Sequence, residues 1–290
     1  MAGYLIGIDN GGSEIKCALF DLTGKTVMIA RRRLPLDQPH PGWTERDAEA
    51  VWRASAETIR ETVTGSGISP REILAAGLTG YGNGMLLVDE NGAPVTPCIV
   101  STDSRASDYG SRFAQSGAQR QIFHQTLQTI WSAQPAALIP WFQDHDKAVL
   151  DRSAKFLGIK DWIRFRLTGN MATEVTEASS TCLFHLKDRR FDPEIFRALG
   201  IEAYHRLAPR CVESTAISGY VTEAAAAETG LQAGMPVAGG YFDIDANALA
   251  SGILDERRLC LIAGTWSINQ YLSKTANEEY DLNRNTTTLS

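Results

Sequence analysis

The sequence predicts an α/β fold that opens with three strands, one helix and a fourth strand. Two observations predict this order. Short apolar runs separated by glycine-containing turns occupy residues 4–34, a pattern typical of strands joined by tight turns. Residues 48–63 carry apolar side chains three and four positions apart, as in an amphipathic helix, and an apolar run at 73–78 follows. With 290 residues, 43% of them hydrophobic, the chain can bury a sizeable core.

The first three strands are expected to be antiparallel, because tight turns at residues 10–13 and 23–25 separate them. Asp47 is placed to cap the following helix, and Gly65 and Gly67 end it. The order strand-strand-strand-helix-strand is that of a ribonuclease-H-like core, which actin, Hsp70 chaperones and sugar kinases share. A plain Rossmann unit would alternate strand and helix from the start. The expected strands cover residues 4–9, 14–22 and 26–34.

The rest of the chain continues the α/β pattern. A hairpin with arms at residues 85–88 and 94–100 is expected about Asn91-Gly92, a strong two-residue turn signal. Residues 104–165 then carry a helical pattern. Further strands are expected at 219–221, 236–242, 259–263 and 268–272, and further helices at 223–229 and 243–252.

The composition excludes several classes of protein. A net charge of −6 argues against nucleic-acid and anionic-membrane partners, which favour basic surfaces. The five cysteines are widely spaced without a CxxC pair, which indicates reduced thiols. The N-terminus lacks a signal-peptide pattern and no run of 18 apolar residues occurs, so we expect a cytoplasmic protein. The sequence leaves the oligomeric state open, a homodimer included.

The first turn carries a candidate phosphate-binding loop. Asp9 ends an apolar run and is followed directly by Asn10, Gly11, Gly12 and Ser13. Small residues let backbone N–H groups approach phosphate oxygens, and the serine hydroxyl adds a donor. Asp9 would then hold Mg²⁺ through water. Taken alone, this turn favours a plain Asn-Gly hairpin, so its interpretation depends on the rest of the chain.

A second candidate lies at residues 239–246, where two glycines end an apolar run and Asp243 opens the expected helix. Asp243 is suited either to capping that helix or to acting as a general base that accepts the proton of a sugar hydroxyl. Asp245 competes for either role. These residues by themselves do not decide between the alternatives.

Weaker signals lie between the two candidates. Asp103 is suited to binding sugar hydroxyls or, like Ser104, to capping the next helix. Trp131, Trp141 and Trp162 lie in the helical stretch and are expected mainly in the core, with sugar stacking as the lesser alternative. The five histidines show no metal-ligand spacing.

Six segments occur in the order and spacing of the FGGY carbohydrate kinases, which the chain resembles from residue 4 to about residue 272. Asp-Asn-Gly-Gly at residue 9, Phe-Asp at 242 and Gly-Thr-Trp-Ser at 264 look most like the L-xylulose and 3-keto-L-gulonate kinase branch. Two departures are that Gly12-Ser13 replaces two threonines and that Asn83 stands where many xylulose kinases have histidine. The segments are residues 7–13 with Lys16, residues 42–47 with Trp52, residues 79–84, residues 101–106, Lys160-Asp161-Trp162 with Arg164 and residues 167–169, and Gly239-Gly240 before Asp243 with Gly264-Thr265.

The resemblance implies phosphoryl transfer from Mg-ATP to a primary hydroxyl of a ketopentose or related keto sugar, with L-xylulose favoured. It makes Asp243 the general base and Asp9 the Mg²⁺ ligand. Asp243 is preferred over Asp245 because a later glycine of the family then falls on Gly252. The implied partners are the sugar and ATP. The implied phosphate- and ATP-binding residues are Asn10, Gly11, Gly12, Ser13, Lys16, Gly264 and Thr265, and the implied sugar-binding residues are Tyr81, Gly82, Asn83, Asp103 and Asp243.

The resemblance also implies a division into two domains. Residues 1–242 are expected to form a complete sugar-binding domain, and residues 243–290 the start of a truncated nucleotide-binding domain, because family members are substantially longer. The alternative is a catalytically inactive sugar-binding fragment that lacks the adenine pocket. A chaperone-like or actin-like ATPase on the same core is disfavoured by the segments at residues 42–47 and 160–169.

Overall fold

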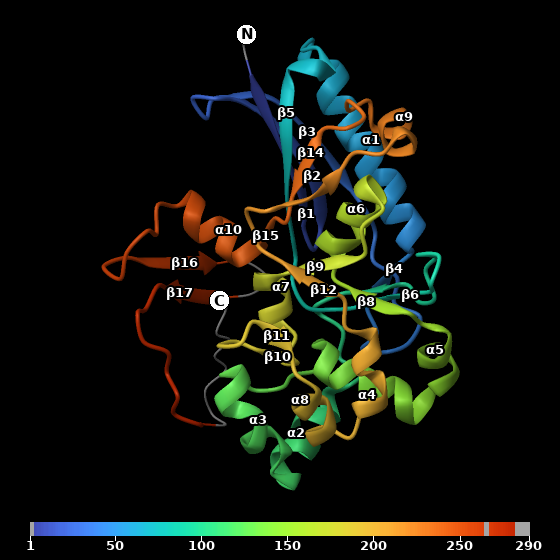
Figure 1. Cartoon of the computed structure of the whole chain (residues 1–290), viewed down its shortest axis with the longest axis vertical. Helices are drawn as coiled ribbons and strands as arrows, with labels where there is room; N and C mark the ends of the chain where they lie inside the picture. Colours follow the sequence, from blue (N-terminus) through green and yellow to red (C-terminus); the bar gives the residue numbers. More distant parts are fainter. Residues whose placement is uncertain (1–2, 264–266, 282–290) are drawn as a thin grey trace.

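The computed structural model of the chain describes residues 3–263 and 267–281, which form a mixed α/β structure (Figure 1). A seven-stranded sheet dominates the upper half of the view, and helices gather below it. Its strands follow the order β13-β14-β5-β1-β2-β3, and β15 also pairs with β5. The predicted α/β class is therefore confirmed. The strands are β1 (Tyr4–Asn10), β2 (Glu14–Asp21), β3 (Thr26–Arg33), β5 (Ile73–Gly80), β13 (Ile217–Tyr220), β14 (Pro236–Ala238) and β15 (Tyr241–Phe242).

The predicted three-stranded meander and the helix after it are present. β1 pairs antiparallel with β2, and β2 pairs antiparallel with β3, whereas β5 lies parallel to β1. Alternate residues of these strands, such as Ile8 and Cys17, are buried in one core with α1 (Ala48–Ser66). The Asp47 carboxylate accepts the Ala50 N–H at 2.6 Å, which confirms the predicted cap.

The helix α1 continues past its predicted end. Gly65 was expected to end the helix, but it lies inside it. Gly67 takes the left-handed conformation, with φ 68°, and ends the helix by donating its N–H to the Thr64 carbonyl. At Gly65 the helix passes so close to β3 that a Cβ there would lie 2.8 Å from the Met28 methyl group. Because that methyl group is the far end of a flexible side chain, a shift of Met28 would accommodate a Cβ at this position.

The hairpin predicted about Asn91-Gly92 is confirmed, with an irregular ladder. The Gly92 N–H donates to the Asp89 carbonyl in the turn, and bridges join Val88 to Pro94 and Met85 to Ile99. Proline has no N–H to donate, so Pro94 itself adds no donor to this ladder. The arms also pair with distant segments: β6 (Leu86–Val88) with β8 (Lys155–Leu157), and β7 (Cys98–Ile99) with β4 (Glu45–Arg46).

The region predicted as helical over residues 104–165 forms four helices, then β8, and then α6. Together with later elements it encloses a second hydrophobic core, which buries Trp141, while Trp162 is buried in the core beside the sheet. Trp131 is half-buried. The helices are α2 (Ser107–Ser116), α3 (Ala118–Thr126), α4 (Pro135–His145), α5 (Lys147–Arg152), α6 (Ile159–Thr168), α7 (Val175–Ser180), α8 (Pro193–Ala198) and α9 (Glu223–Thr229), with 3₁₀ turns at Pro70–Glu72 and Glu202–Leu207. Short strands β9 (Ala172–Glu174), β10 (Phe184–His185), β11 (Arg190–Phe191) and β12 (Arg210–Val212) connect them.

The last elements form a unit beside the sheet. A helix, α10 (Asp243–Ala250), and a hairpin of β16 (Leu259–Ala263) and β17 (Ser267–Tyr271) agree with the predicted order, and the hairpin extends to the left in Figure 1. The strand predicted at residues 236–242 is divided into β14 and β15 by Gly239-Gly240.

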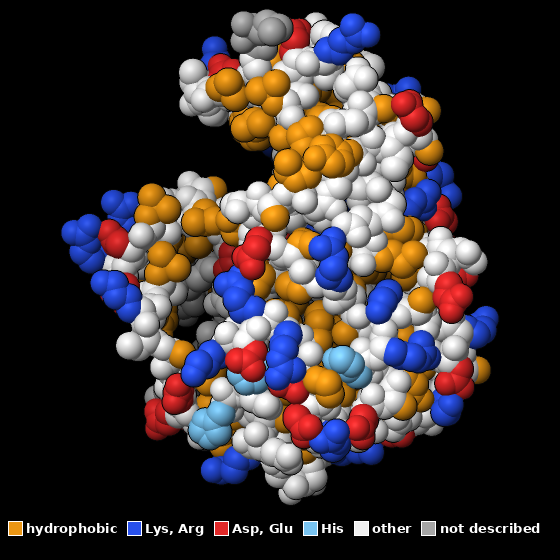
Figure 2. Space-filling view, viewed as in Figure 1, with side chains coloured by type: hydrophobic (Ala, Val, Ile, Leu, Met, Phe, Trp, Pro, Cys, Tyr) orange, Lys and Arg blue, Asp and Glu red, His pale blue; other side chains and the backbone are white. Residues whose placement is uncertain are grey.

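The surface is hollowed between the sheet and the β16–β17 hairpin, as Figure 2 shows on the left of the molecule. Large hydrophobic side chains are exposed on both elements, among them Leu5 and Leu74 in the sheet and Leu261 and Tyr271 in the hairpin. None of the helices in the described part of the chain is both long and apolar enough to cross a bilayer.

Candidate active site

The candidate residues from distant parts of the sequence meet at one edge of the sheet. β5 runs parallel to both β1 and β15, with Asp9 opposite Thr79 and Thr79 opposite Tyr241. Parallel strands place their carboxyl ends at the same edge, where α/β proteins commonly bind ligands. The first turn, the loop at residues 81–84 and Asp243 therefore lie together.

The first turn is compact and partly exposed. The Gly11 N–H donates to the Glu14 carbonyl at 3.1 Å, which closes the turn, and Gly12 and Ser13 are exposed. The Lys16 ammonium lies 3.8 Å from the Asp9 carboxylate, directly across the β1–β2 pair. A positive side chain and exposed glycine backbone at one turn are suited to binding phosphate.

Arg46 supports this turn from inside the protein, a role that the sequence did not indicate. Its side chain is buried, and its guanidinium donates to the carbonyls of Gly11 at 3.2 Å and Gly12 at 2.5 Å. The C=O and N–H of a planar trans peptide point in opposite directions. Anchoring these carbonyls inward therefore turns the N–H groups of Gly12 and Ser13 outward. The only sequence signal was the place of Arg46 in the 42–47 segment.

Asn10 connects the first turn to two other elements. Its side-chain amide donates to the Ser55 hydroxyl of α1 at 2.9 Å, and its backbone carbonyl accepts the Tyr81 N–H at 3.1 Å. The side chain is buried, so Asn10 holds the end of β1 against α1 and against the loop that begins with Tyr81.

Asp243 is the first residue of α10, and Phe242 occupies the N-cap position. The capping alternative for Asp243 is therefore not what the structure shows. Burial and, second to it, the nearby Asp9 carboxylate together raise the pKa of Asp243 to about 6, although backbone N–H groups partly offset them. Burial also raises the pKa of Asp9, partly offset by Lys16. A carboxylate with a pKa near neutrality is suited to accepting a proton.

Asp245, the competing carboxylate, is directed toward the hairpin. It accepts a hydrogen bond from the Gln270 side chain of β17 at 2.8 Å. Burial raises its pKa to about 7, with Glu174 as the next cause, whereas Asp9 is the second cause of the shift at Asp243. Of the two aspartates, Asp243 is thus the one whose charge is coupled to the first turn.

The loop after β5 presents buried polar atoms. Tyr81 and Asn83 are buried, and neither the Tyr81 hydroxyl nor the Asn83 Oδ1 has a hydrogen-bond partner within the described residues. Buried polar atoms are rarely left unpaired, so unsatisfied atoms at a site are suited to meeting a ligand or water. Gly82 has no room for a side chain, because a Cβ there would lie 1.2 Å from the Phe242 ring.

Asp103 was predicted to bind sugar together with Tyr81 and Asn83, but its side chain is buried more deeply than theirs. Its fully buried carboxylate accepts the Thr44 N–H at 2.7 Å and pairs with Arg105, whose guanidinium stacks 4.0 Å from the Trp43 ring. The next helix, α2, begins without a side-chain cap, so neither Asp103 nor Ser104 caps it. The structure thus shows Asp103 as an anchor for the segment at residues 42–47.

Two of the predicted phosphate-binding residues cannot be placed in this geometry. Gly264 and Thr265 lie outside the described residues, between β16 and β17.

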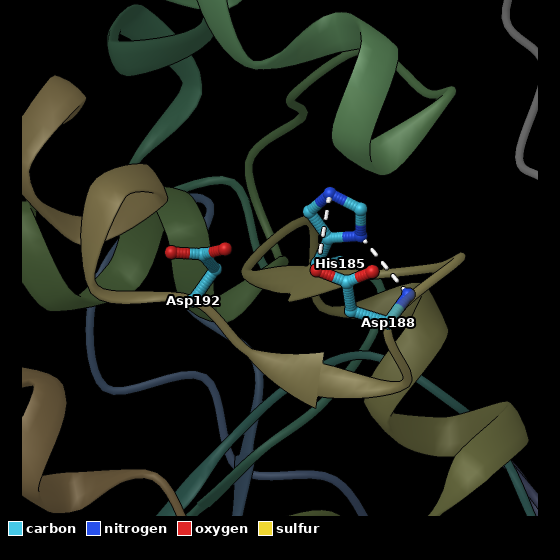
Figure 3. Close-up of side chains that lie close together, drawn as sticks. All are labelled: His185, Asp188 and Asp192. Carbon is cyan, nitrogen blue, oxygen red and sulfur yellow. Dashed lines mark hydrogen bonds and ion pairs between the residues drawn. The ribbon is translucent and has the colours of Figure 1, made fainter.

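A separate group of metal-type side chains lies in the β10–β11 hairpin. His185, Asp188 and Asp192 bring ligand atoms within 4.8 Å of one another, and His185 and Asp188 face each other (Figure 3). These groups already have partners: the His185 Nδ1 accepts the Asp188 N–H, and Arg190 lies 3.4 Å from Asp188 and 2.8 Å from Asp192. We interpret the group as the ion pairs of the hairpin, because the guanidinium already supplies the positive charge.

Comparisons with known proteins show which sequences and folds this chain is similar to. The L-xylulose/3-keto-L-gulonate kinase of Escherichia coli K12 is 34% identical over 94% of this chain and 55% of its own length. A protein of Pasteurella multocida named "Probable L-xylulose kinase" is 34% identical over 96% of this chain and 58% of its own. The crystal structure of xylulose kinase from Rhodospirillum rubrum matches 89% of this chain and 52% of that one with a TM-score of 0.83 and 27% identity.

The chain therefore spans little more than half the length of these relatives. Its residues 4–250 match the N-terminal domain of the FGGY family of carbohydrate kinases. Because that match covers most of the 290 residues, the chain belongs to the FGGY family of carbohydrate kinases.

Proposed function

We propose that this chain contributes the sugar-binding part of an ATP-dependent kinase that phosphorylates a primary hydroxyl of a ketopentose or related keto sugar. The observation that carries the proposal is the meeting of Asp243, the first turn and the loop at residues 81–84 at one sheet edge. L-Xylulose is the favoured substrate, since two relatives at 34% identity carry L-xylulose in their names. In this proposal residues 1–242 form the sugar-binding domain and residues 243–290 begin the nucleotide-binding domain.

The chain's own residues would act by positioning and by moving one proton. The Tyr81 hydroxyl and the Asn83 side chain would bind sugar hydroxyls. Asp243 would accept the proton of the hydroxyl that attacks the γ-phosphorus of ATP. Outward N–H groups of Gly12 and Ser13 would bind phosphate oxygens. Little covalent chemistry is required of a kinase, so orientation and charge stabilisation dominate its catalysis.

The residues present also fit a magnesium ion that accompanies ATP. Mg²⁺ prefers oxygen ligands and keeps several waters. The Asp9 carboxylate lies half-buried at the same edge and raises the pKa of Asp243, so two carboxylates share this site. When bound, the ion neutralises charge on the transferred phosphoryl group. We also infer a cytoplasmic location, which the five free cysteines support.

The test of the general base is the variant Asp243→Asn, with Asp245→Asn as the matched control on the same helix. We expect phosphoryl transfer to fall by a factor on the order of 10³ in Asp243→Asn, while sugar binding stays within about threefold and Asp245→Asn keeps most turnover. A coupled ADP-release assay with L-xylulose, D-xylulose, L-ribulose and 3-keto-L-gulonate would measure turnover, and calorimetry would measure binding. Near-normal turnover by Asp243→Asn would refute the assignment. Sugar binding by the folded chain without any turnover would instead favour the non-catalytic alternative.

A further inference from the structure

A buried ionic network lies directly behind the segment that leads to Asp243. The Lys160 ammonium is 3.2 Å from the Glu174 carboxylate and 3.3 Å from the Asp161 carboxylate. Arg164 also pairs with Asp161, at 2.9 Å. All four of these side chains have an exposed fraction of 0%. Two cations and two carboxylates balance each other, so the network can remain charged without contact with water.

The network holds the backbone before Asp243 at two points. Arg164 donates to the Gly239 carbonyl at 2.6 Å. Ser214 donates its hydroxyl to Glu174, and its carbonyl accepts the Gly240 N–H at 2.9 Å. The two glycines that divide β14 from β15 are therefore fixed by groups that are themselves fixed by the network.

Thr176 connects the network to a third residue of this segment, Phe242. Its hydroxyl donates to the Glu174 carboxylate at 2.7 Å and accepts the Phe242 N–H at 2.8 Å. Phe242 is the residue directly before Asp243, and its ring fills the space that Gly82 leaves open. The chain of contacts thus runs from Lys160 through Glu174 and Thr176 to the Phe242 amide, one residue before Asp243.

The chemistry of this connection requires a hydroxyl. An ionised carboxylate accepts hydrogen bonds only, so the Thr176 O–H must donate to Glu174, which leaves a lone pair of the hydroxyl oxygen to accept the Phe242 N–H. Hydrogen bonds to charged groups are stronger than neutral ones, and a low-dielectric interior strengthens them further. The result is a rigid contact from the ion pair to the backbone of β15.

We propose that Thr176 is a positioning residue for Asp243, which it holds in place through the Phe242 amide, with the buried Lys160–Glu174 pair as its anchor. This inference rests on the proposed role of Asp243 as the base. Displacing a catalytic group by about 1 Å is enough to cost on the order of 100-fold in rate. Thr176 lies 66 positions before Phe242 and outside the six segments of the family resemblance.

The direct test is the exchange rate of the Phe242 amide in three variants of the full chain. Thr176→Val keeps the shape and removes both hydrogen bonds, Thr176→Ser restores the hydroxyl, and Thr58→Val is the control. Thr58 is likewise buried, but its hydroxyl donates to the Ala54 carbonyl within its own helix. Selective ¹⁵N-phenylalanine labelling limits the spectrum to the ten phenylalanine amides of the chain. The signal that is absent in Phe242→Leu identifies the Phe242 amide.

We expect the Phe242 amide to exchange at least about tenfold faster in Thr176→Val and within about twofold of the original chain in Thr176→Ser and Thr58→Val. In the sugar-dependent assay we expect Thr176→Val to lower kcat about tenfold or more with little change in the KM for sugar, and Thr176→Ser to restore it. An unchanged Phe242 exchange rate in Thr176→Val would overturn the inference, and so would an equal loss in Thr58→Val.

The double variant Thr176→Val/Asp243→Asn separates this inference from the proposed function. If Thr176 acts through Asp243, adding Thr176→Val to Asp243→Asn lowers turnover no further. If Asp243→Asn alone keeps normal turnover, the base assignment fails, whereas faster Phe242 exchange in Thr176→Val would still show that Thr176 holds this segment. Additive losses in the double variant would show that Thr176 acts through another group and would contradict the positioning role.

Discussion

Arg46 shows how one buried side chain shapes an exposed loop. The planar guanidinium carries several N–H groups in a fixed arrangement, so one side chain reaches the carbonyls of both Gly11 and Gly12. A lysine at this position would keep the charge but could not donate in the same planar, two-pronged geometry. The phosphate binding that we propose for the first turn therefore depends on a residue whose guanidinium contacts the carbonyl side of that turn.

We predict that Arg46→Lys weakens nucleotide use without affecting the sugar. The KM for ATP should rise by about tenfold, because the outward N–H groups of the turn lose their fixed direction, while sugar affinity stays within about twofold. Steady-state kinetics with varied ATP and calorimetry with sugar would measure the two effects. Arg53→Lys, an exposed position on α1, is the control. An unchanged KM for ATP in Arg46→Lys would contradict the role given to this side chain.

At the scale of elements, the break between β14 and β15 depends on Gly240. This residue has φ 91°, and a Cβ there would lie 2.3 Å from the Leu78 carbonyl oxygen of β5. Both the conformation and the lack of space require glycine. The break lets β15 continue alongside β5 to Phe242, so that Asp243 follows at the edge of the sheet.

We predict that Gly240→Ala destabilises the protein more than a positive φ alone would. Gly234 provides the matched control, with φ 81° and no atom within 4 Å of the added Cβ. Gly234→Ala should lower the free energy of unfolding by about 1 kcal/mol, the cost of the left-handed conformation. Gly240→Ala should lower it by about 1–3 kcal/mol more, because of overlap with the Leu78 carbonyl. Urea denaturation would measure both changes. Equal decreases in the free energy of unfolding for the two variants would show that the backbone near Gly240 shifts to admit the Cβ at no added cost.

At the scale of the whole molecule, acidic groups with raised pKa values gather between the sheet edge and the helical half. Burial raises the pKa of Asp243 to about 6, of Asp245 to about 7 and of Glu177 to about 8. Lys160 opposes the shift at Glu177 by lying 4.0 Å from its carboxylate, while neighbouring carboxylates add to it. The folded protein therefore holds protons that the unfolded chain releases at lower pH.

This arrangement predicts the sign of the pH dependence of stability. Between about pH 5 and pH 8 these three groups hold more protons in the folded state than in the unfolded state, so the free energy of unfolding should fall as pH rises. Glu177→Gln removes one of these groups and should flatten the fall between pH 6.5 and pH 8. Denaturation at pH 5, 6.5 and 8 would measure the slope, with the exposed Glu90→Gln as control. A slope that Glu177→Gln leaves unchanged would show that Glu177 is ionised throughout this range.

Much of the fold could be predicted from the sequence because its signals are local. The meander follows from apolar runs and tight turns, the start of α1 follows from the capping chemistry of Asp47, and α10 and the hairpin after it follow from periodicity. The prediction that was wrong also has a local cause. Gly65 was expected to end α1, but a glycine inside a helix costs only about 1 kcal/mol relative to alanine, and the left-handed Gly67 ends the helix instead.

The sequence by itself determined the α/β class, the family resemblance and which residue types could carry the chemistry of the site. Only the tertiary structure decided which distant groups meet: Arg46 with the turn 34 positions before it, Asp243 with Asp9 across β5, and Thr176 with the Phe242 amide. It also decided that Asp103 is an anchor and that Asp243 does not cap its helix. The physical reason is that turns, caps and periodicity depend on neighbours in sequence. Contacts between residues tens of positions apart depend instead on how the packed elements bring them together.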